Sequence, residues 1–348
     1  MSRDVSRGAF LGDHVLVLEH GDASRLRSRG RYGITVTQGA LRLDLVEALH
    51  LMDEGRLRVD ARREDIFSAG YRLHPDFGVR HIAYADLRGR GLVLAPAGGD
   101  RTFLSYPRGS DFGEDPEAAI RAVSERDIFS FRRTLDLVDA CTSDCLAAMI
   151  SVVDDEGDVT HYRVTRVDPC GDARPEIPDG AVTVLRDRGI VDDSEVAERL
   201  HEDGFFGHRM GPRTVLSLVE TAYLGESGMA LVSGGRRIAP AAVVRLALRT
   251  DPAAGLKIQA YRELRGRGLI PKTGFKFGGH FRVYDVMPAR KRESDRTHAR
   301  YLVQIVPLHF TAPWEEISRA VRLAQGVRKE MIYMSPPGRY LRLERIRP

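Results

Sequence analysis

The chain has 348 residues, 43% of them hydrophobic and 29% charged, with a net charge of +4. This composition is typical of a globular protein and excludes fibrous and disordered classes. No apolar run reaches the roughly 18 residues of a membrane-spanning helix, the first residues lack the apolar core of a signal peptide, and three cysteines form no disulfide framework. We therefore expect a cytoplasmic protein of two or more domains with no membrane partner.

The sequence repeats itself at about half its length. Three pairs of segments align at offsets of 173, 174 and 177 residues: 45–59 with 218–232, 30–33 with 204–207, and 84–94 with 261–271. We call residues 10–168 the first copy and residues 180–348 the second copy. The segment PCGDARPEIPD between them reads as a linker. The resulting division is 1–83 and 84–168 for two subdomains of the first repeat, 169–179 for the linker, and 180–255 and 256–348 for two subdomains of the second.

Hydrophobic periodicity predicts a mixture of helices and strands in both copies. In the second copy it predicts helices at 216–228, 239–250, 256–268 and 314–331, and strands at 281–286, 299–308, 331–334 and 340–346. The last helix should bury a stripe made of Ile317, Ala320, Val321, Ala324 and Val327. The fold class is therefore α/β of the α+β type. Each repeat should have a small α+β N-terminal subdomain followed by a mixed β-sheet flanked by helices.

The charge is unevenly distributed along the chain. Residues 251–348 hold 20 Lys and Arg against 9 Asp and Glu, which leaves 33 basic and 40 acidic residues in 1–250. The two parts thus carry net charges of +11 and −7. All five lysines lie in the basic part, at positions 257, 272, 276, 291 and 329. This pattern indicates a polyanion such as nucleic acid, or an acidic protein surface, as the partner of the C-terminal end.

Residues that are present in only one of the two copies are candidates for catalysis. Tyr284 aligns with Tyr106, but Lys329 aligns with Ala147 and Arg322 with Ala140. His298 falls opposite the stretch 115–123, which contains no histidine. Only the second copy therefore holds tyrosine, histidine and lysine together.

These three residue types suit RNA cleavage. RNA supplies its own nucleophile, the 2′-hydroxyl, so the protein must provide a base, an acid for the departing 5′-oxygen, and positive charge on the phosphate. Histidine titrates near neutral pH and lysine carries a fixed charge. Tyrosine, with a reference pKa near 10, is a poor base unless cations lower it. His280 and His309 remain alternative acids on this reasoning.

At these residues the sequence resembles the archaeal tRNA-splicing endonucleases. The segments PKTGFKFGGHFRVY (271–284), HARYLVQIV (298–306) and ISRAVRLAQGVRKEM (317–331) resemble the catalytic motifs of that family, and GFFGHRMGPRTVLSLVETAYL (204–224) resembles its N-terminal motif. The resemblance implies a restriction-endonuclease-like C-terminal subdomain. It also implies cleavage of precursor tRNA at a bulge–helix–bulge, without a metal or other cofactor, leaving 2′,3′-cyclic phosphate and 5′-hydroxyl ends.

The resemblance also implies roles for individual residues. Tyr284 would be the general base, His298 the general acid and Lys329 the stabiliser of the transition state. Arg322 would stack on a bulged base, together with a second arginine from the C-terminal strand, for which Arg345 is preferred over Arg342. Lys276, within the first catalytic motif, is also expected to bind RNA.

The duplication indicates how such a protein would assemble. Members of the family with a fused, inactive first copy form homodimers, in which an acidic loop of that copy docks into a basic pocket of the neighbouring active copy. The turn 152–159 resembles this loop and carries Asp154, Asp155, Glu156 and Asp158, whereas the second copy has SPPG at 335–338. The basic stretch 287–297 is longer than is usual in the family, and it is either an RNA contact or a surface loop.

Two other readings stay open. The chain could be a non-catalytic structural subunit that binds tRNA and needs a catalytic partner. It could also be a metal-dependent nuclease on a similar sheet.

Overall fold

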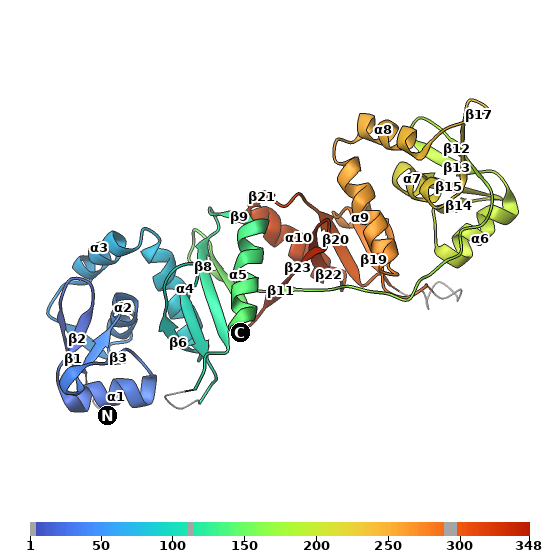
Figure 1. Cartoon of the computed structure of the whole chain (residues 1–348). Helices are drawn as coiled ribbons and strands as arrows, with labels where there is room; N and C mark the ends of the chain where they lie inside the picture. Colours follow the sequence, from blue (N-terminus) through green and yellow to red (C-terminus); the bar gives the residue numbers. More distant parts are fainter. Residues whose placement is uncertain (1–4, 110–113, 289–297) are drawn as a thin grey trace. The chain divides into compact units, whose positions relative to one another are not determined.

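The computed structural model describes residues 5–109, 114–288 and 298–348 (Figure 1). These residues form two compact units, which we describe separately. Unit 1 comprises Met1–Thr165, Thr311–Ile317 and Glu344–Pro348, and unit 2 comprises Arg166–Phe310 and Ser318–Leu343. The predicted basic stretch 287–297 lies outside the described residues from 289 onward.

The N-terminal subdomain of the first copy is a small sheet with helices packed on it. Its elements are β1 (Ser6–Phe10), β2 (Val15–Val17), α1 (His20–Gly30), β3 (Ile34–Thr35), β4 (Leu41–Leu43), α2 (Leu45–Asp53), β5 (Leu57–Val59) and α3 (Arg63–Leu73). The strands are hydrogen-bonded in the order β3-β4-β2-β1-β5. Helix α2 begins at a capping box, because the Asp44 side chain accepts from the helix and Glu47 reaches back to the Asp44 N–H.

The second subdomain of the first copy is a mixed sheet with two helices. One helix precedes the strands in the sequence, and the other connects two of them. It contains α4 (Phe77–Gly89), β6 (Val93–Pro96), β7 (Phe103–Tyr106), β8 (Ala118–Ser124), β9 (Ile128–Ser130), α5 (Phe131–Ser143), β10 (Ala147–Val153) and β11 (Val159–Arg166). Five of these strands follow the order β6-β7-β8-β10-β11, in which β8 and β10 are parallel and the other neighbours are antiparallel. The apolar faces of both subdomains share one core.

The second copy repeats this plan. Its N-terminal subdomain contains β12 (Ala181–Val184), β13 (Arg188–Val191), α6 (Ser194–Gly204), β14 (His208–Met210), β15 (Arg213–Ser217), α7 (Leu218–Glu226), β16 (Ala230–Ser233), β17 (Arg236–Arg237) and α8 (Pro240–Thr250). The later part contains α9 (Ala254–Gly266), β18 (Ile270–Thr273), β19 (Phe281–Tyr284), β20 (Tyr301–Ile305), β21 (Thr311–Pro313), α10 (Trp314–Gly326), β22 (Glu330–Ser335) and β23 (Arg339–Ile346).

The strand orders of the two copies coincide. The orders β14-β15-β13-β12-β16-β17 and β18-β19-β20-β22-β23 match those of the first copy strand for strand, with β17 as an added edge. The predicted α+β fold and the tandem duplication are therefore confirmed. None of the helices in the described part of the chain is long and apolar enough to cross a membrane.

One strand from the later sequence belongs to the first unit. β21 pairs antiparallel with β9, with Ala312 opposite Phe129. Trp314 follows, and its ring lies 5.3 Å from the Phe129 ring and 5.8 Å from the Tyr162 ring, measured between centroids. Nothing in the local sequence pattern marks this pairing, because it joins residues about 180 positions apart.

Three predicted helices have wrong boundaries. The helix predicted at 256–268 spans Ala254–Gly266. The helix predicted at 216–228 begins only at Leu218, because the Ser217 hydroxyl caps it by accepting the N–H of Glu220, and Leu216 belongs to β15. The helix predicted at 314–331 ends at Gly326.

The early end of α10 changes the place of two residues. Arg328 adopts a left-handed conformation with φ of 55°, which turns the chain from α10 into β22. Val327 is accordingly 40% exposed and does not belong to the buried stripe, while Lys329 lies in the connection rather than on a helix.

Candidate active site

Tyr284 is the last residue of β19 and is almost buried, with 7% of its surface exposed. Its ring meets the Phe205 ring edge-on at 5.6 Å between centroids. It shares a small apolar cluster with Ala173, Ile270 and Ala299. These neighbours come from the linker, from β18 and from the segment just before β20, so the position of Tyr284 depends on all three segments.

His298 is exposed and lies three residues before β20. Its neighbour Ala299 is 4% exposed and packs in the same cluster as Tyr284. The histidine thus emerges at the surface directly beside the tyrosine cluster.

Lys329 lies between α10 and β22. Its backbone N–H donates to the Ala324 carbonyl at 2.9 Å, which closes the end of the helix. Its Nζ atom lies 5.2 Å from the centre of the Phe277 ring. Partial burial and the positive charge of Arg282 lower the pKa of Lys329.

The strand register explains why these three residues gather. β19 runs antiparallel to β20, with Val283 opposite Tyr301, and β20 runs parallel to β22, with Tyr301 opposite Glu330. The end of β19 and the starts of β20 and β22 therefore share one edge of the sheet. Tyr284, the residues before Tyr301 and Lys329 all lie at that edge.

The two alternative histidines lie elsewhere. His280 precedes the start of β19, and His309 follows the end of β20, so both are at the opposite ends of these strands. The Nδ1 atom of His280 accepts the Ile305 N–H at 2.9 Å. Burial and the charge of Lys257 lower the pKa of His280 to about 4, which keeps its ring neutral near pH 7. His298 is thus the histidine at the edge that holds Tyr284 and Lys329.

A chain of ion pairs runs along the same edge. Arg300 donates to Asp285 at 3.1 Å through Nη1 and to Glu330 at 2.8 Å through Nε, and Arg342 donates to the other Glu330 oxygen at 3.0 Å. These hydrogen bonds raise the pKa of Arg300. The paired residues lie on or beside four neighbouring strands, and two of them, Asp285 and Glu330, directly follow Tyr284 and Lys329 in the sequence. Sequence reasoning missed Arg300, Asp285 and Glu330.

The linker is also part of the site. Gly171 donates its N–H to the Arg267 carbonyl at 3.0 Å, and Ala173 donates to the Gly268 carbonyl at 3.0 Å. A Cβ atom on Gly171 would lie 2.4 Å from the Gly268 oxygen, so only glycine fits this close approach. The linker is therefore held against the α9–β18 turn, which brings Ala173 to Tyr284.

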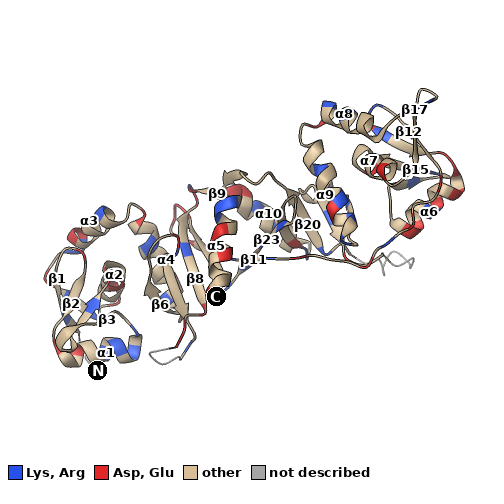
Figure 2. Cartoon of the chain, viewed as in Figure 1, with Lys and Arg blue, Asp and Glu red and all other residues tan. Residues whose placement is uncertain are grey.

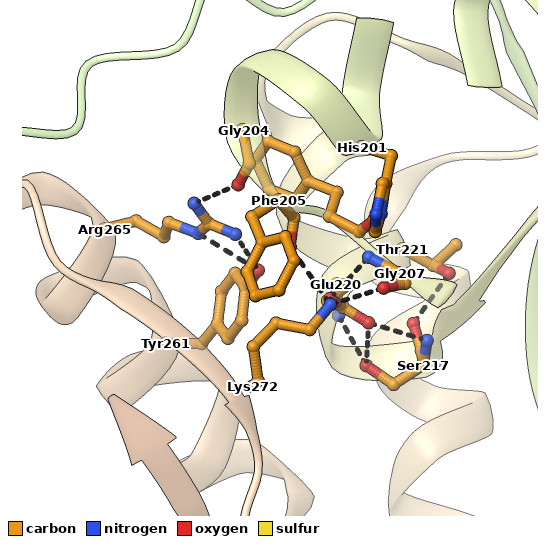
Figure 3. A network of polar contacts seen from close by, with 11 residues as sticks. His201, Gly204, Phe205, Gly207, Ser217, Glu220, Thr221, Tyr261, Arg265 and Lys272 are labelled. Atoms are coloured by element: carbon orange, nitrogen blue, oxygen red, sulfur yellow. Dashed lines mark hydrogen bonds and ion pairs between the residues drawn. The ribbon is translucent and has the colours of Figure 1, made fainter. Parts of the chain in front are cut away.

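A buried polar network supports Phe205 (Figure 3). Lys272 is 9% exposed. Its ammonium group donates to the carbonyls of Phe205 and Gly207 and lies 3.5 Å from a Glu220 oxygen. Burial alone would raise the pKa of Glu220, but the Lys272 charge and the N–H groups of Ser217 and Gly207 bring it below its ordinary value. The network thus contains an ionised carboxylate paired with a lysine.

A second buried cation flanks that network. Arg265 donates to the Gly204 carbonyl at 2.8 Å and to the Tyr261 hydroxyl at 3.0 and 3.1 Å, and its guanidinium carbon lies 3.9 Å from the centre of the Phe206 ring. The turn that presents Phe205 is therefore held from both sides.

The first copy keeps this arrangement without the lysine. Glu47 accepts the N–H groups of Gly33 and Asp44, as Glu220 does at its own site, but Ala95 stands where Lys272 stands. Complete burial raises the pKa of Glu47 to about 7. A cavity of about 530 Å³ opens here, lined by Glu47 and Ala95 among others, and Arg27 donates to the Gly33 carbonyl beside it.

The structure also corrects the alignment of the copies by one position. Val303 and Ile120 occupy the same place in the sheet, since each is paired with the equivalent phenylalanine, and the left-handed residues Arg328 and Cys145 end equivalent helices. Lys329 therefore corresponds to Leu146, not to Ala147.

The one-position correction also changes the residue that aligns with Arg322. Arg322 corresponds to Asp139, not to Ala140. The first copy still lacks both cations. When charged residues of the two copies are compared at this corrected alignment, Arg300 is a further difference, because Glu117 occupies its place in the first copy.

The remaining predicted RNA-binding residues lie at the surface of the chain. Arg322 and Lys276 are exposed, as is Arg345, whereas Arg342 is half-buried and bonded to Glu330. Phe275, next to Lys276, is 87% exposed.

The predicted docking loop is an ordered turn between β10 and β11. An Asp154 oxygen accepts the N–H groups of Glu156 at 3.0 Å and Asp158 at 2.8 Å, and Asp155 pairs with Arg126. Asp154 therefore builds the turn, while the exposed side chains of Glu156 and Asp158 carry its outward charge. Figure 2 shows where the charged residues lie on both units.

Comparisons with known proteins agree with the geometry. A family model for the N-terminal domain of tRNA intron endonuclease matches residues 6–70 and 181–244, and the model for its catalytic C-terminal domain matches 77–161 and 255–340. The chain belongs to the tRNA intron endonuclease family and is an enzyme of that family with both domains duplicated.

Relatives match over nearly their whole length. The tRNA-splicing endonuclease of Methanococcoides burtonii is 35% identical, over 94% of this chain and 95% of the relative. That of Methanosarcina acetivorans is 34% identical over 92% and 93%, and that of Halobacterium salinarum 32% over 98% and 99%. The match spans both copies in each case.

Proposed function

We propose that this chain cuts precursor tRNA at both exon–intron junctions, within a bulge–helix–bulge, by attack of the RNA 2′-hydroxyl and without a metal ion. The observation that carries the proposal is the meeting of Tyr284, the His298 segment and Lys329 at one edge of three neighbouring strands. Membership of the tRNA intron endonuclease family supports the substrate.

The chemistry follows from the three roles. Tyr284 takes the proton of the 2′-hydroxyl, and the resulting oxygen attacks the adjacent phosphorus. The bond to the 5′-oxygen of the next nucleotide breaks, and His298 protonates that oxygen. Lys329 stabilises the negative charge that grows on the phosphate oxygens. The products are a 2′,3′-cyclic phosphate and a 5′-hydroxyl, with no water consumed.

We infer that the bulged bases are held by arginines. Arg322 would stack on one base, with Arg345 as the first choice for the second arginine and Arg342 as the alternative. Lys276 would contact the RNA backbone. Lys276, Arg322 and Arg345 have exposed side chains, which such contacts require.

We further propose a homodimer in which the acidic loop of each first copy docks into a basic pocket of the partner's second copy. The ordered turn with its exposed Glu156 and Asp158 supports this arrangement. The division into subdomains 1–83, 84–168, 180–255 and 256–348 around the linker 169–179 is part of the same proposal. A cytoplasmic location stays a prediction.

The deciding experiment is cleavage of a defined intron-containing precursor tRNA by the purified chain in excess EDTA. We expect two cuts, with cyclic phosphate and 5′-hydroxyl ends. Loss of activity in EDTA that Mg²⁺ restores would favour a metal-dependent nuclease. Binding without cleavage would favour a structural subunit that needs a catalytic partner.

A further inference from the structure

Arg282 lies on the same face of the sheet as Tyr284. It is two residues earlier on β19, and side chains alternate between faces along a strand. Its neighbours across the sheet are Lys272 on β18 and Leu302 on β20. Arg282 is therefore one step inward from the edge that holds the three proposed catalytic residues.

Strand register places Arg282 near Lys329, because Arg282 is opposite Leu302, Leu302 is opposite Met331, and Lys329 comes two residues before Met331. The positive charge of Arg282 is the charged-group contribution that lowers the pKa of Lys329, beside the effect of burial. Neighbouring like charges repel each other, and an anion bound between or beside them relieves the repulsion. Nε of Arg282 is buried and has no hydrogen-bond partner among the residues that the structure describes. A buried N–H without a partner is uncommon and calls for a ligand or a water.

The first copy has neither cation. Arg282 corresponds to Leu104, since Phe281 and Phe103 begin the equivalent strands, and Lys329 corresponds to Leu146. Both positions thus hold leucine in the copy without the histidine and lysine. Packing alone does not require the charges, because the same strand accommodates leucine there.

We propose that Arg282 is a further catalytic residue, which binds a non-bridging oxygen of the scissile phosphate together with Lys329. This inference rests on the proposed function. Arg282 would supply a planar guanidinium whose N–H groups point at the phosphate, while Lys329 would supply a compact charge from the other side. Two donors at the phosphate would stabilise the transition state more than either does alone.

The test compares three variants of the full chain in single-turnover cleavage of a precursor tRNA. Arg282→Leu, which takes the residue of the first copy, should slow cleavage about 10²-fold, the usual effect of removing one oxyanion donor. Arg282→Lys should be slowed less than Arg282→Leu, because the charge remains although the planar set of donors is lost. Arg245→Leu, an exposed arginine on α8, serves as the matched control and should cleave like the parent chain.

A sulfur substitution at the scissile phosphate separates a contact from a packing effect. The parent chain should be slowed by sulfur at the oxygen that Arg282 binds, and Arg282→Leu should lose most of that sensitivity. Arg282→Gln, measured the same way, covers the case in which the leucine variant does not fold. An unchanged sulfur effect, or cleavage by Arg282→Leu within twofold of the parent rate, would overturn the inference. Failure of the parent chain to cleave would instead refute the proposed function.

Discussion

The Nζ atom of Lys272 lies 3.5 Å from the Oε1 atom of Glu220 inside the second copy, and Ala95 and Glu47 occupy the same two places in the first copy. Each of these two glutamates belongs to the capping box of a helix, and each carboxylate accepts the N–H of a glycine. Only the second is neutralised by a lysine, which also holds the carbonyl of Phe205 beside Tyr284. Both copies thus bury a glutamate at this place, but only in the second copy is it paired with a lysine that binds the Phe205 turn.

Removing the lysine should therefore damage stability and the site together. We expect Lys272→Met to lower the free energy of unfolding by about 3–5 kcal/mol, since it leaves the Glu220 carboxylate buried and unpaired. The control is Lys257→Met, because Lys257 pairs with Asp251 near the surface, where an ion pair contributes about 0–1 kcal/mol. Urea unfolding of both variants measures the free energy of unfolding. Equal decreases in the two variants would show that the buried pair of Lys272 and Glu220 is no more stabilising than the surface pair.

The unpaired acid of the first copy should make stability depend on pH. The folded pKa of Glu47, about 7, lies above its ordinary value of 4.5. The stabilising proton is thus present in full below pH 4.5 and is lost as the pH rises through 7, which costs on the order of 3 kcal/mol. We expect the first unit to unfold at a lower temperature at pH 8 than at pH 5.

Two variants check this assignment by thermal unfolding between pH 5 and 8. Glu47→Gln should flatten the pH dependence because the titrating group is gone. Ala95→Lys should also flatten it, by supplying the missing cation and filling part of the cavity. A slope that persists in Glu47→Gln would assign the dependence to another group.

Arg300 should act by position rather than by touching the substrate. Arg300→Gln breaks its bonds to Asp285 and Glu330, which tie the starts of β20 and β22 to the end of β19. Since a small displacement of catalytic groups lowers the rate steeply, we expect kcat to fall about 10- to 100-fold with KM little changed. Arg262→Gln, which breaks a comparable two-point pair with Glu226 on other helices, should leave kcat unaltered. A rise in KM without a change in kcat would indicate a direct RNA contact instead.

The identity of the acid can be tested with histidine variants. His298→Ala should slow cleavage by about 10²- to 10⁴-fold, the usual contribution of general acid–base catalysis. His309→Ala, at the other end of β20, should have no effect. Lys329→Ala should slow cleavage without weakening RNA binding in proportion. Normal cleavage by His298→Ala would remove it from the mechanism.

The docking loop calls for selective substitution. Neutralising Asp154 would break the turn, so we choose Glu156→Gln with Asp158→Asn, which leave its hydrogen bonds in place. We expect the mass measured by light scattering to fall from that of a dimer to that of a monomer, with cleavage lost at the same time. Glu195→Gln with Glu198→Gln on α6 is the matched control. A dimer that survives the loop substitutions would exclude this mode of assembly.

Much of the site could be predicted because it depends on repeats and motifs that are visible in the sequence. The duplication, the α+β class and the concentration of Tyr284, His298 and Lys329 in one copy follow from repeats and motifs in the sequence. The end of α10 could not be predicted, since apolar periodicity continues to Val327 while the left-handed turn at Arg328 ends the helix.

The sequence by itself determined which copy combines the aligned tyrosine with a histidine and a lysine, because the types of residue in each copy differ. Only the tertiary structure decided which side chains meet. Strand register joined Arg300 to residues 15 and 30 positions away, set His298 rather than His280 beside Tyr284, and placed Arg282 opposite Leu302 on the face of the sheet that carries Tyr284. The physical reason is that a strand fixes a residue's neighbours through hydrogen bonds to other strands, and these partners lie far away in the chain.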